Sequence, residues 1–270
     1  MIGAIIGDIV GSRWEFKPTN DYGFEWLSKE NGFTDDTICT VAVADALLHG
    51  RDFGESIHDW CNRYPNPMGG YGGRFAMWVH SSNPQPYNSF GNGSAMRVSP
   101  VAHWYESADE VLNAAAATAK PSHNHKEGIK GAQTVALAIF KAKQFGNDAP
   151  NHIDDILQEC IKFSGYDIHI RKEDVINRFD ETCQGTVPVA LWIIGLSDSF
   201  EDAVRKAVSL GADADTLGAI VGSIAEAIWG IPEEIKQEIL EYLPDDMKLV
   251  ISDFLAEQSG KAERYEHINE

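Results

Sequence analysis

The chain has 270 residues, of which 43% are hydrophobic and 10% aromatic. This composition is typical of a globular protein, and we expect a single domain spanning residues 1–270. Its formal net charge of −19 argues against a nucleic-acid backbone or an anionic membrane as partner, because like charges repel. The four cysteines are scattered, and we identify neither a signal peptide nor the roughly 20-residue apolar stretch of a membrane span. We therefore expect a cytoplasmic protein.

The N-terminal segment has the apolar periodicity of a buried helix over residues 2–10. Three glycines recur at every fourth position and predict close packing against another helix: Gly3, Gly7 and Gly11. Asp8 interrupts the apolar face. Glu15 follows between two aromatic residues, which would raise its pKa if they desolvate it, as a general acid or base requires. A glutamate facing solvent is the alternative.

Two clusters of carboxylates and hydroxyls each begin an apolar helix, at residues 34–37 (TDDT) and 213–216 (DADT). If they converge in the fold, they form an oxygen-only site that suits Mg²⁺ or Mn²⁺, and the lack of His and Cys argues against zinc. The alternative is that these Asp and Thr residues are ordinary helix caps, which complement the helix dipole.

The sequence of residues 51–100 predicts loops and short helices. Their glycine-rich part, residues 66–73, matches neither a P-loop nor a dinucleotide-binding motif. Residues 89–97 (SFGNGSAMR) contain two glycines that allow a tight backbone path. The backbone N–H groups of this segment, together with the side chains of Asn92 and Ser94, could bind a phosphate. A simple Gly-Asn-Gly turn is the alternative.

From residue 108 onward the pattern is helical and shows no sustained period-two alternation. We therefore predict an all-α fold. The predicted helices cover residues 108–119, 127–144, 152–164, 172–179, 187–196, 201–210, 216–229, 233–243 and 246–257.

Taken in order, five motifs resemble those of the ADP-ribosylglycohydrolase family: Gly7-Asp8 with Gly11-Ser12 and Glu15, then residues 34–37, 91–97, 122–123 and 213–218. The resemblance spans most of the chain. It implies a single-domain orthogonal bundle of many helices with a binuclear magnesium cleft. It also implies hydrolysis of the bond between ADP-ribose and an acceptor, which is a modified protein side chain or a small molecule.

Carried over to this sequence, the resemblance implies specific roles. Two Mg²⁺ ions, for which Mn²⁺ could substitute, would be bound by Thr34, Asp35, Asp36, Asp213, Asp215 and Thr216. The candidate catalytic carboxylates are Glu15 and Asp35. ADP-ribose would be contacted by Phe90, Gly91, Asn92, Gly93, Ser94, Met96 and His123. The chain departs from the family at Ala212 and Ala214, often glycine and threonine, which supply no essential ligand group.

Three other functions remain open. A magnesium-dependent phosphohydrolase could use Asp213 and Asp215, but no apolar strand precedes them. A calcium-binding loop would need polar ligands where Leu217 and Ile224 stand. A catalytically silent protein that only binds ADP-ribose is the third, and turnover of an ADP-ribosylated substrate would separate it from an enzyme.

Overall fold

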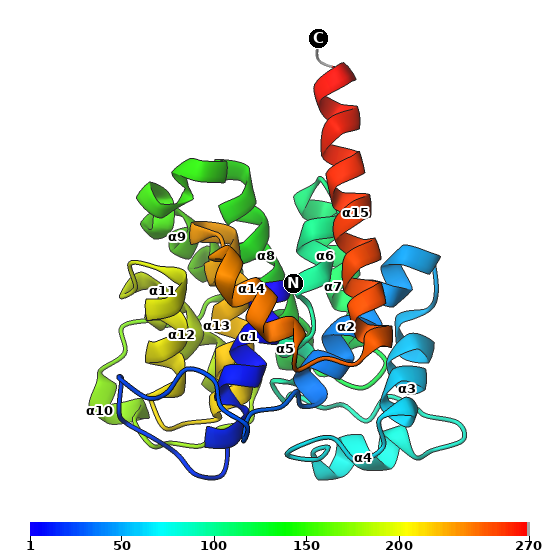
Figure 1. Ribbon diagram of the computed structural model, residues 1–270, viewed down its shortest axis with the longest axis horizontal. Helices are drawn as coiled ribbons and strands as arrows, with labels where there is room; N and C mark the ends of the chain where they lie inside the picture. The colour runs from blue at the N-terminus through cyan, green and yellow to red at the C-terminus, as the bar shows by residue number, and fades with distance from the viewer. Residues whose placement is uncertain (269–270) are drawn as a thin grey trace.

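The computed structural model describes residues 1–268, with side chains to residue 260. Within that range every regular element is helical, which confirms the all-α prediction (Figure 1). The elements are α1 (Ile2–Gly11), η1 (Ser12–Trp14), α2 (Asp35–His49), α3 (Phe53–Arg63), α4 (Gly73–Val79), α5 (Gly93–Met96), α6 (Ser99–Trp104), α7 (Ala108–Ala119), α8 (Lys126–Phe145), η2 (Gly146–His152), α9 (Ile153–Ser164), α10 (Lys172–Val175), α11 (Cys183–Gly195), α12 (Phe200–Val208), α13 (Ala214–Trp229), α14 (Glu233–Leu240) and α15 (Asp245–Ile268).

Helices α1 and α13 pack against each other at the centre of the molecule (Figure 1). They run antiparallel, because Gly3 lies against Gly222 and Gly7 lies against Gly218. A Cβ atom on Gly7 would collide with the carbonyl group of Gly218, so only glycine allows this approach. The glycine spacing therefore predicted the packing correctly, and the antiparallel arrangement brings the end of α1 beside the start of α13.

Other helices surround this pair. α2 contacts α1, α3 and α15, while α8 contacts α7, α9, α11 and α13. All of these elements contribute to one continuous cluster of buried apolar side chains. None of the helices in the described part of the chain is both long and apolar enough to cross a membrane.

Several predicted helix boundaries are wrong. The last helix continues to Ile268 instead of ending at residue 257, and the helix predicted over residues 233–243 ends at Leu240. The helix predicted over residues 172–179 ends already at Val175, and Asn177 adopts a left-handed backbone conformation with φ of 57°. That conformation is incompatible with a continuing right-handed helix, so residues 176–182 form a loop. The helix predicted from residue 187 begins at Cys183, because the Thr182 side chain accepts a hydrogen bond from the Gly185 N–H and caps it.

Candidate active site

A cleft of about 450 Å³ lies where the end of α1, the start of α2 and the start of α13 meet. Glu15 and five other predicted site residues of these segments line it: Asp35, Asp36, Asp213, Asp215 and Thr216. The remaining walls come from the glycine-rich segment 69–75, residues 87–97, His123 and Glu181. Segments far apart in sequence thus place their polar groups around one space.

The two acidic clusters converge in this cleft. The hydroxyl of Thr216 donates a hydrogen bond to Oδ2 of Asp36 at 3.2 Å, which joins the start of α13 to the start of α2. Carboxylate oxygens of Glu15, Asp213 and Asp215 all lie within 4.8 Å of one another. Glu15 reaches them because η1 continues the chain directly from the end of α1, which lies beside the start of α13.

Asp8 organises the start of α2 from within α1. Its carboxylate is completely buried and accepts hydrogen bonds from the backbone N–H and the hydroxyl of Thr34, at 3.0 and 2.8 Å. It also accepts bonds from the N–H and hydroxyl of Thr37. Burial raises the pKa of Asp8 to about 6, although these hydrogen bonds oppose the shift. The sequence analysis noted Asp8 as an interruption of an apolar face and as part of a family motif, but assigned it no role.

The crowding of carboxylates raises their pKa values. Burial, reinforced by neighbouring acidic groups, raises the pKa of Glu15 to about 8 and that of Asp213 to about 7. For Asp35, Asp36 and Asp215 the same causes raise the pKa well above its usual range. The cleft therefore holds a large excess of acidic groups that are costly to ionise in the absence of a cation.

These groups fit hard divalent cations. Oδ1 of Asp36 and Oδ1 of Asp215 are buried yet have no hydrogen-bond partner among the described residues. A buried oxygen without a donor is unfavourable unless it meets a ligand. Since the available donors are all oxygens, they suit Mg²⁺ or Mn²⁺ better than a soft metal.

Five of the seven predicted substrate-binding residues line the cleft: Gly91, Asn92, Gly93, Met96 and His123. The Asn92 amide is already engaged, because it donates to Asp213 at 2.7 Å and to Thr186 at 3.1 Å. The hydroxyl of Ser94 donates instead to the carbonyl of Gly128. Phe90 is 42% exposed and packs against the ring of His125, outside the residues that line the cleft.

His123 presents an uncharged ring to the cleft. The ring is buried, its Nδ1 lies 2.8 Å from the hydroxyl of Ser122, and its pKa is lowered well below the usual range. Burial is the main cause, and the positive charge of Arg97 adds to it. His123 can therefore hydrogen-bond a polar ligand without carrying charge.

Ser89 and Arg97 line the cleft and belong to the predicted segment 89–97, although neither was assigned a role. Other residues that line it were missed by the sequence interpretation: Tyr71, Arg74, Phe75, Tyr87 and Glu181. The glycines of residues 66–73 were the available signal. Gly69 has φ of 77° and lies so close to Glu15 that a Cβ atom there would come 2.5 Å from Oε2. Glu181 carries no comparable signal, because nothing in its neighbourhood distinguishes it from a surface glutamate.

Comparisons with known proteins agree with this geometry. Residues 1–264 match the model of the ADP-ribosylglycohydrolase family. The chain is 25% identical to ADP-ribosylhydrolase ARH3 of Mus musculus, covering 88% of this chain and 85% of that protein. It is 26% identical to ADP-ribosylarginine hydrolase Tri1 of Pseudomonas putida (strain GB-1), covering 86% and 70%. A solved ADP-ribosylglycohydrolase-related protein complex superposes with a TM-score of 0.69 at 25% identity, covering 94% of this chain and 95% of that one.

Proposed function

Because this chain belongs to the ADP-ribosylglycohydrolase family, we propose that it is a metal-dependent hydrolase of the bond between ADP-ribose and an acceptor. The acceptor is a modified protein side chain or a small molecule. The observation that carries the proposal is the convergence of Glu15 with both acidic clusters at one cleft. Such a concentration of buried carboxylates with raised pKa values is typical of a catalytic centre.

Two Mg²⁺ ions would be held by the six oxygen-bearing residues Thr34, Asp35, Asp36, Asp213, Asp215 and Thr216. The Thr34 hydroxyl donates its proton to Asp8 and accepts a hydrogen bond from the N–H of Asp36, which leaves one lone pair available to a cation. Bound divalent cations supply positive charge that orients ribose hydroxyls and lowers the pKa of a water molecule. They also offset the repulsion between an acidic protein and a diphosphate.

Glu15 is the residue best placed to move a proton. It lines the cleft from outside the two helix starts, and burial, reinforced by neighbouring carboxylates, raises its pKa to about 8 in the metal-free protein. Cations bound beside it would lower this pKa, so that the ionised carboxylate could accept a proton from an attacking water near neutral pH. Asp35, which lines the same cleft, is the second candidate for this role.

The rest of the substrate would extend along residues 89–97. The backbone of Gly91 and Gly93 lies open to the cleft, and the neutral ring of His123 lies against both glycines. Arg74 contributes a positive charge to the same wall, with its guanidinium stacked over the ring of Tyr87. Phe90 is exposed but lies outside the cleft lining, so its predicted contact with the nucleoside end requires the substrate to extend beyond the cleft.

The proposal is tested with a panel of defined substrates, including arginine-linked and serine-linked ADP-ribosyl peptides and small ADP-ribose conjugates. We expect ADP-ribose release that EDTA abolishes and that Mg²⁺ or Mn²⁺, but not Zn²⁺, restores. Release by a verified metal-free sample would refute the metal requirement. Tight binding of ADP-ribose without turnover of any substrate would instead support a non-catalytic binding protein.

A further inference from the structure

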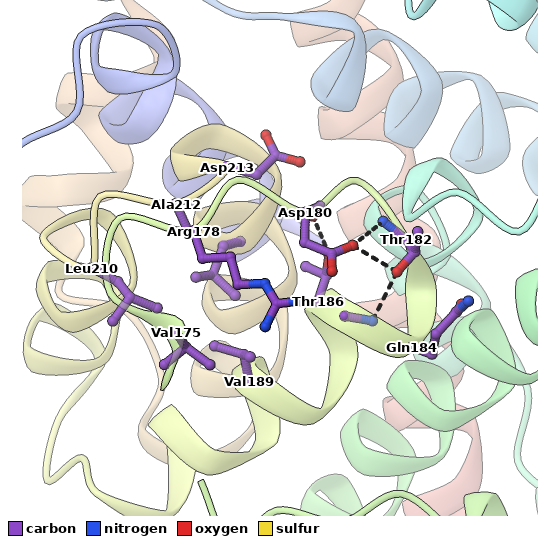
Figure 2. A pocket seen from close by; sticks show the side chains of 12 residues that line it. Val175, Arg178, Asp180, Thr182, Gln184, Thr186, Val189, Leu210, Ala212 and Asp213 are labelled. Carbon is purple, nitrogen blue, oxygen red and sulfur yellow. Dashed lines mark hydrogen bonds between the residues drawn. The ribbon is translucent and has the colours of Figure 1, made fainter. Parts of the chain in front are cut away.

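A second pocket, of about 270 Å³, adjoins the cleft (Figure 2). It is formed by the loop that follows α10, the start of α11 and the corner that precedes α13. Asp213 borders both pockets. The assigned metal and substrate residues are otherwise absent from its walls, so the proposed hydrolysis leaves this pocket without a role.

One side of this second pocket is apolar. Val189, Leu210 and Leu217 are buried and half-buried Val175 completes the surface. These four side chains enclose a space that suits an aliphatic group of a few carbons.

The other side carries one positive and one negative group that do not neutralise each other. Arg178 makes no side-chain hydrogen bond or ion pair within residues 1–260, although the chain is strongly acidic. In Figure 2 its guanidinium lies among the side chains of the pocket. Asp180 accepts hydrogen bonds from the N–H and hydroxyl of Thr182 through Oδ1 alone, at 2.9 and 2.7 Å. Its Oδ2 accepts none among the described residues.

We propose that this pocket binds a small apolar α-amino acid, such as leucine or valine. The carboxylate of the amino acid pairs with Arg178, its ammonium group pairs with Oδ2 of Asp180, and its side chain packs against the apolar wall. A simple carboxylate would leave Asp180 without a partner, and a simple amine would leave Arg178 without one. A zwitterion with an aliphatic side chain satisfies all three features.

A ligand bound in the second pocket would affect the cleft through the loop between α10 and α11. Arg178 and Asp180 face the second pocket, whereas Glu181 lines the cleft and Phe179 stacks on Phe16 beside Glu15. A ligand held by Arg178 and Asp180 therefore restrains the loop that also contributes Glu181 to the cleft.

The test is calorimetric titration of the EDTA-treated protein with L-leucine, repeated in the presence of saturating ADP-ribose. We expect saturable binding in both conditions, because the pocket shares only Asp213 with the cleft, and Arg178 and Asp180 belong to neither the metal site nor the nucleotide site. 4-Methylpentanoate and 3-methylbutylamine, which are leucine without its ammonium group and without its carboxylate respectively, should each bind at least about tenfold more weakly. Loss of leucine binding on addition of ADP-ribose would place it in the cleft and overturn the proposal, as would no binding up to millimolar leucine.

Two variants and a matched control complete the test. Arg178→Gln should weaken leucine binding at least about tenfold without changing the circular dichroism spectrum, since Arg178 is exposed. Asp180→Asn should weaken it similarly. Arg171→Gln removes an exposed arginine outside the pocket, ion-paired with Asp174, and should bind leucine like wild type. Equal binding by wild type and Arg178→Gln, or equal loss in Arg171→Gln, would overturn the assignment.

Discussion

Glu15 combines the features of a proton-transferring group in a single side chain. Its carboxylate is within 4.8 Å of carboxylate oxygens of Asp213 and Asp215, and Gly69 packs directly against it. The side chain is nevertheless only partly buried, so water and substrate can reach it. Burial is the main cause of its raised pKa and the neighbouring carboxylates add to it, but of the two flanking aromatic residues Phe16 is 69% exposed.

Glu15→Gln should lower kcat by roughly 10²–10⁴ while leaving ADP-ribose affinity near that of wild type, because the amide keeps the shape but cannot accept a proton. Single-turnover hydrolysis and calorimetric titration with ADP-ribose measure the two effects separately. Glu55→Gln, on the exposed first turn of α3, is the matched control and should show neither. Near-normal turnover by Glu15→Gln would assign the proton transfer to Asp35.

Asp36→Asn tests whether the Asp36 carboxylate binds a cation. The amide can still accept the hydrogen bond from Thr216, but it removes a negative charge whose Oδ1 has no partner within the described residues. We expect the thermal stabilisation by MgCl₂ to require at least about tenfold more Mg²⁺, with unchanged helical content. The metal-free variant should melt no lower than wild type, because one repelling charge is gone. A wild-type response to MgCl₂ would show that Asp36 is a structural helix residue only.

At the scale of elements, the pairing of α1 with α13 positions the site. The close approach of the two backbones at Gly7 and Gly218 sets how near η1, and hence Glu15, comes to the start of α13. Asp8 ties α2 to the same helix through the hydroxyls and N–H groups of Thr34 and Thr37. α1 therefore serves as the common support of both acidic clusters.

Gly7→Ala should lower the free energy of unfolding by about 1–3 kcal/mol, because the added Cβ meets rigid backbone of α13 and the helices must separate. Urea denaturation followed by circular dichroism measures the change. Gly73→Ala is the control for stability: it also adds a methyl group within a helix, but nothing lies within 4 Å of the new atom. Equal stability of Gly7→Ala and wild type would show that the helix pair is loosely packed in solution.

At the scale of the whole molecule, the acidic excess and the buried carboxylates make stability depend on pH and on divalent cations. In the metal-free protein the pKa values of Asp8, Asp213 and Glu15 are raised to about 6, 7 and 8 from 3.8, 3.8 and 4.5. Because the folded state holds these protons more tightly, their stabilising contribution is complete below about pH 4 and is lost as pH rises to about 8.

The melting temperature of the EDTA-treated protein should consequently fall as the pH is raised from about 5 to about 8. MgCl₂ should raise the melting temperature most at the upper end of that range, where the carboxylates are ionised and bind a cation best. Scanning calorimetry at several pH values, with KCl at matched ionic strength as control, measures both effects. A stabilisation by MgCl₂ that is independent of pH, or equalled by KCl, would contradict this account.

The sequence alone determined the features that depend on local interactions. The apolar periodicity of residues 2–10 and 108–119 predicted helices that the structure contains, and the glycine spacing of α1 predicted its close packing. The two Asp-Thr clusters could be identified as polar groups at helix starts, because capping and periodicity are properties of neighbouring residues. The ordered motifs were sufficient to indicate the family that residues 1–264 match.

Only the tertiary structure decided which of the polar side chains identified in the sequence lie in contact with one another. The bond between Asp36 and Thr216 spans 180 positions, and no local pattern predicts such a pairing. Glu181 lines the cleft and Arg178 lines the second pocket from a loop, because the helix that was predicted to continue to residue 179 ends at Val175. Backbone conformation at a single non-glycine residue and contacts between distant helices depend on the packing of the whole chain, which is why these positions could not be read from the sequence.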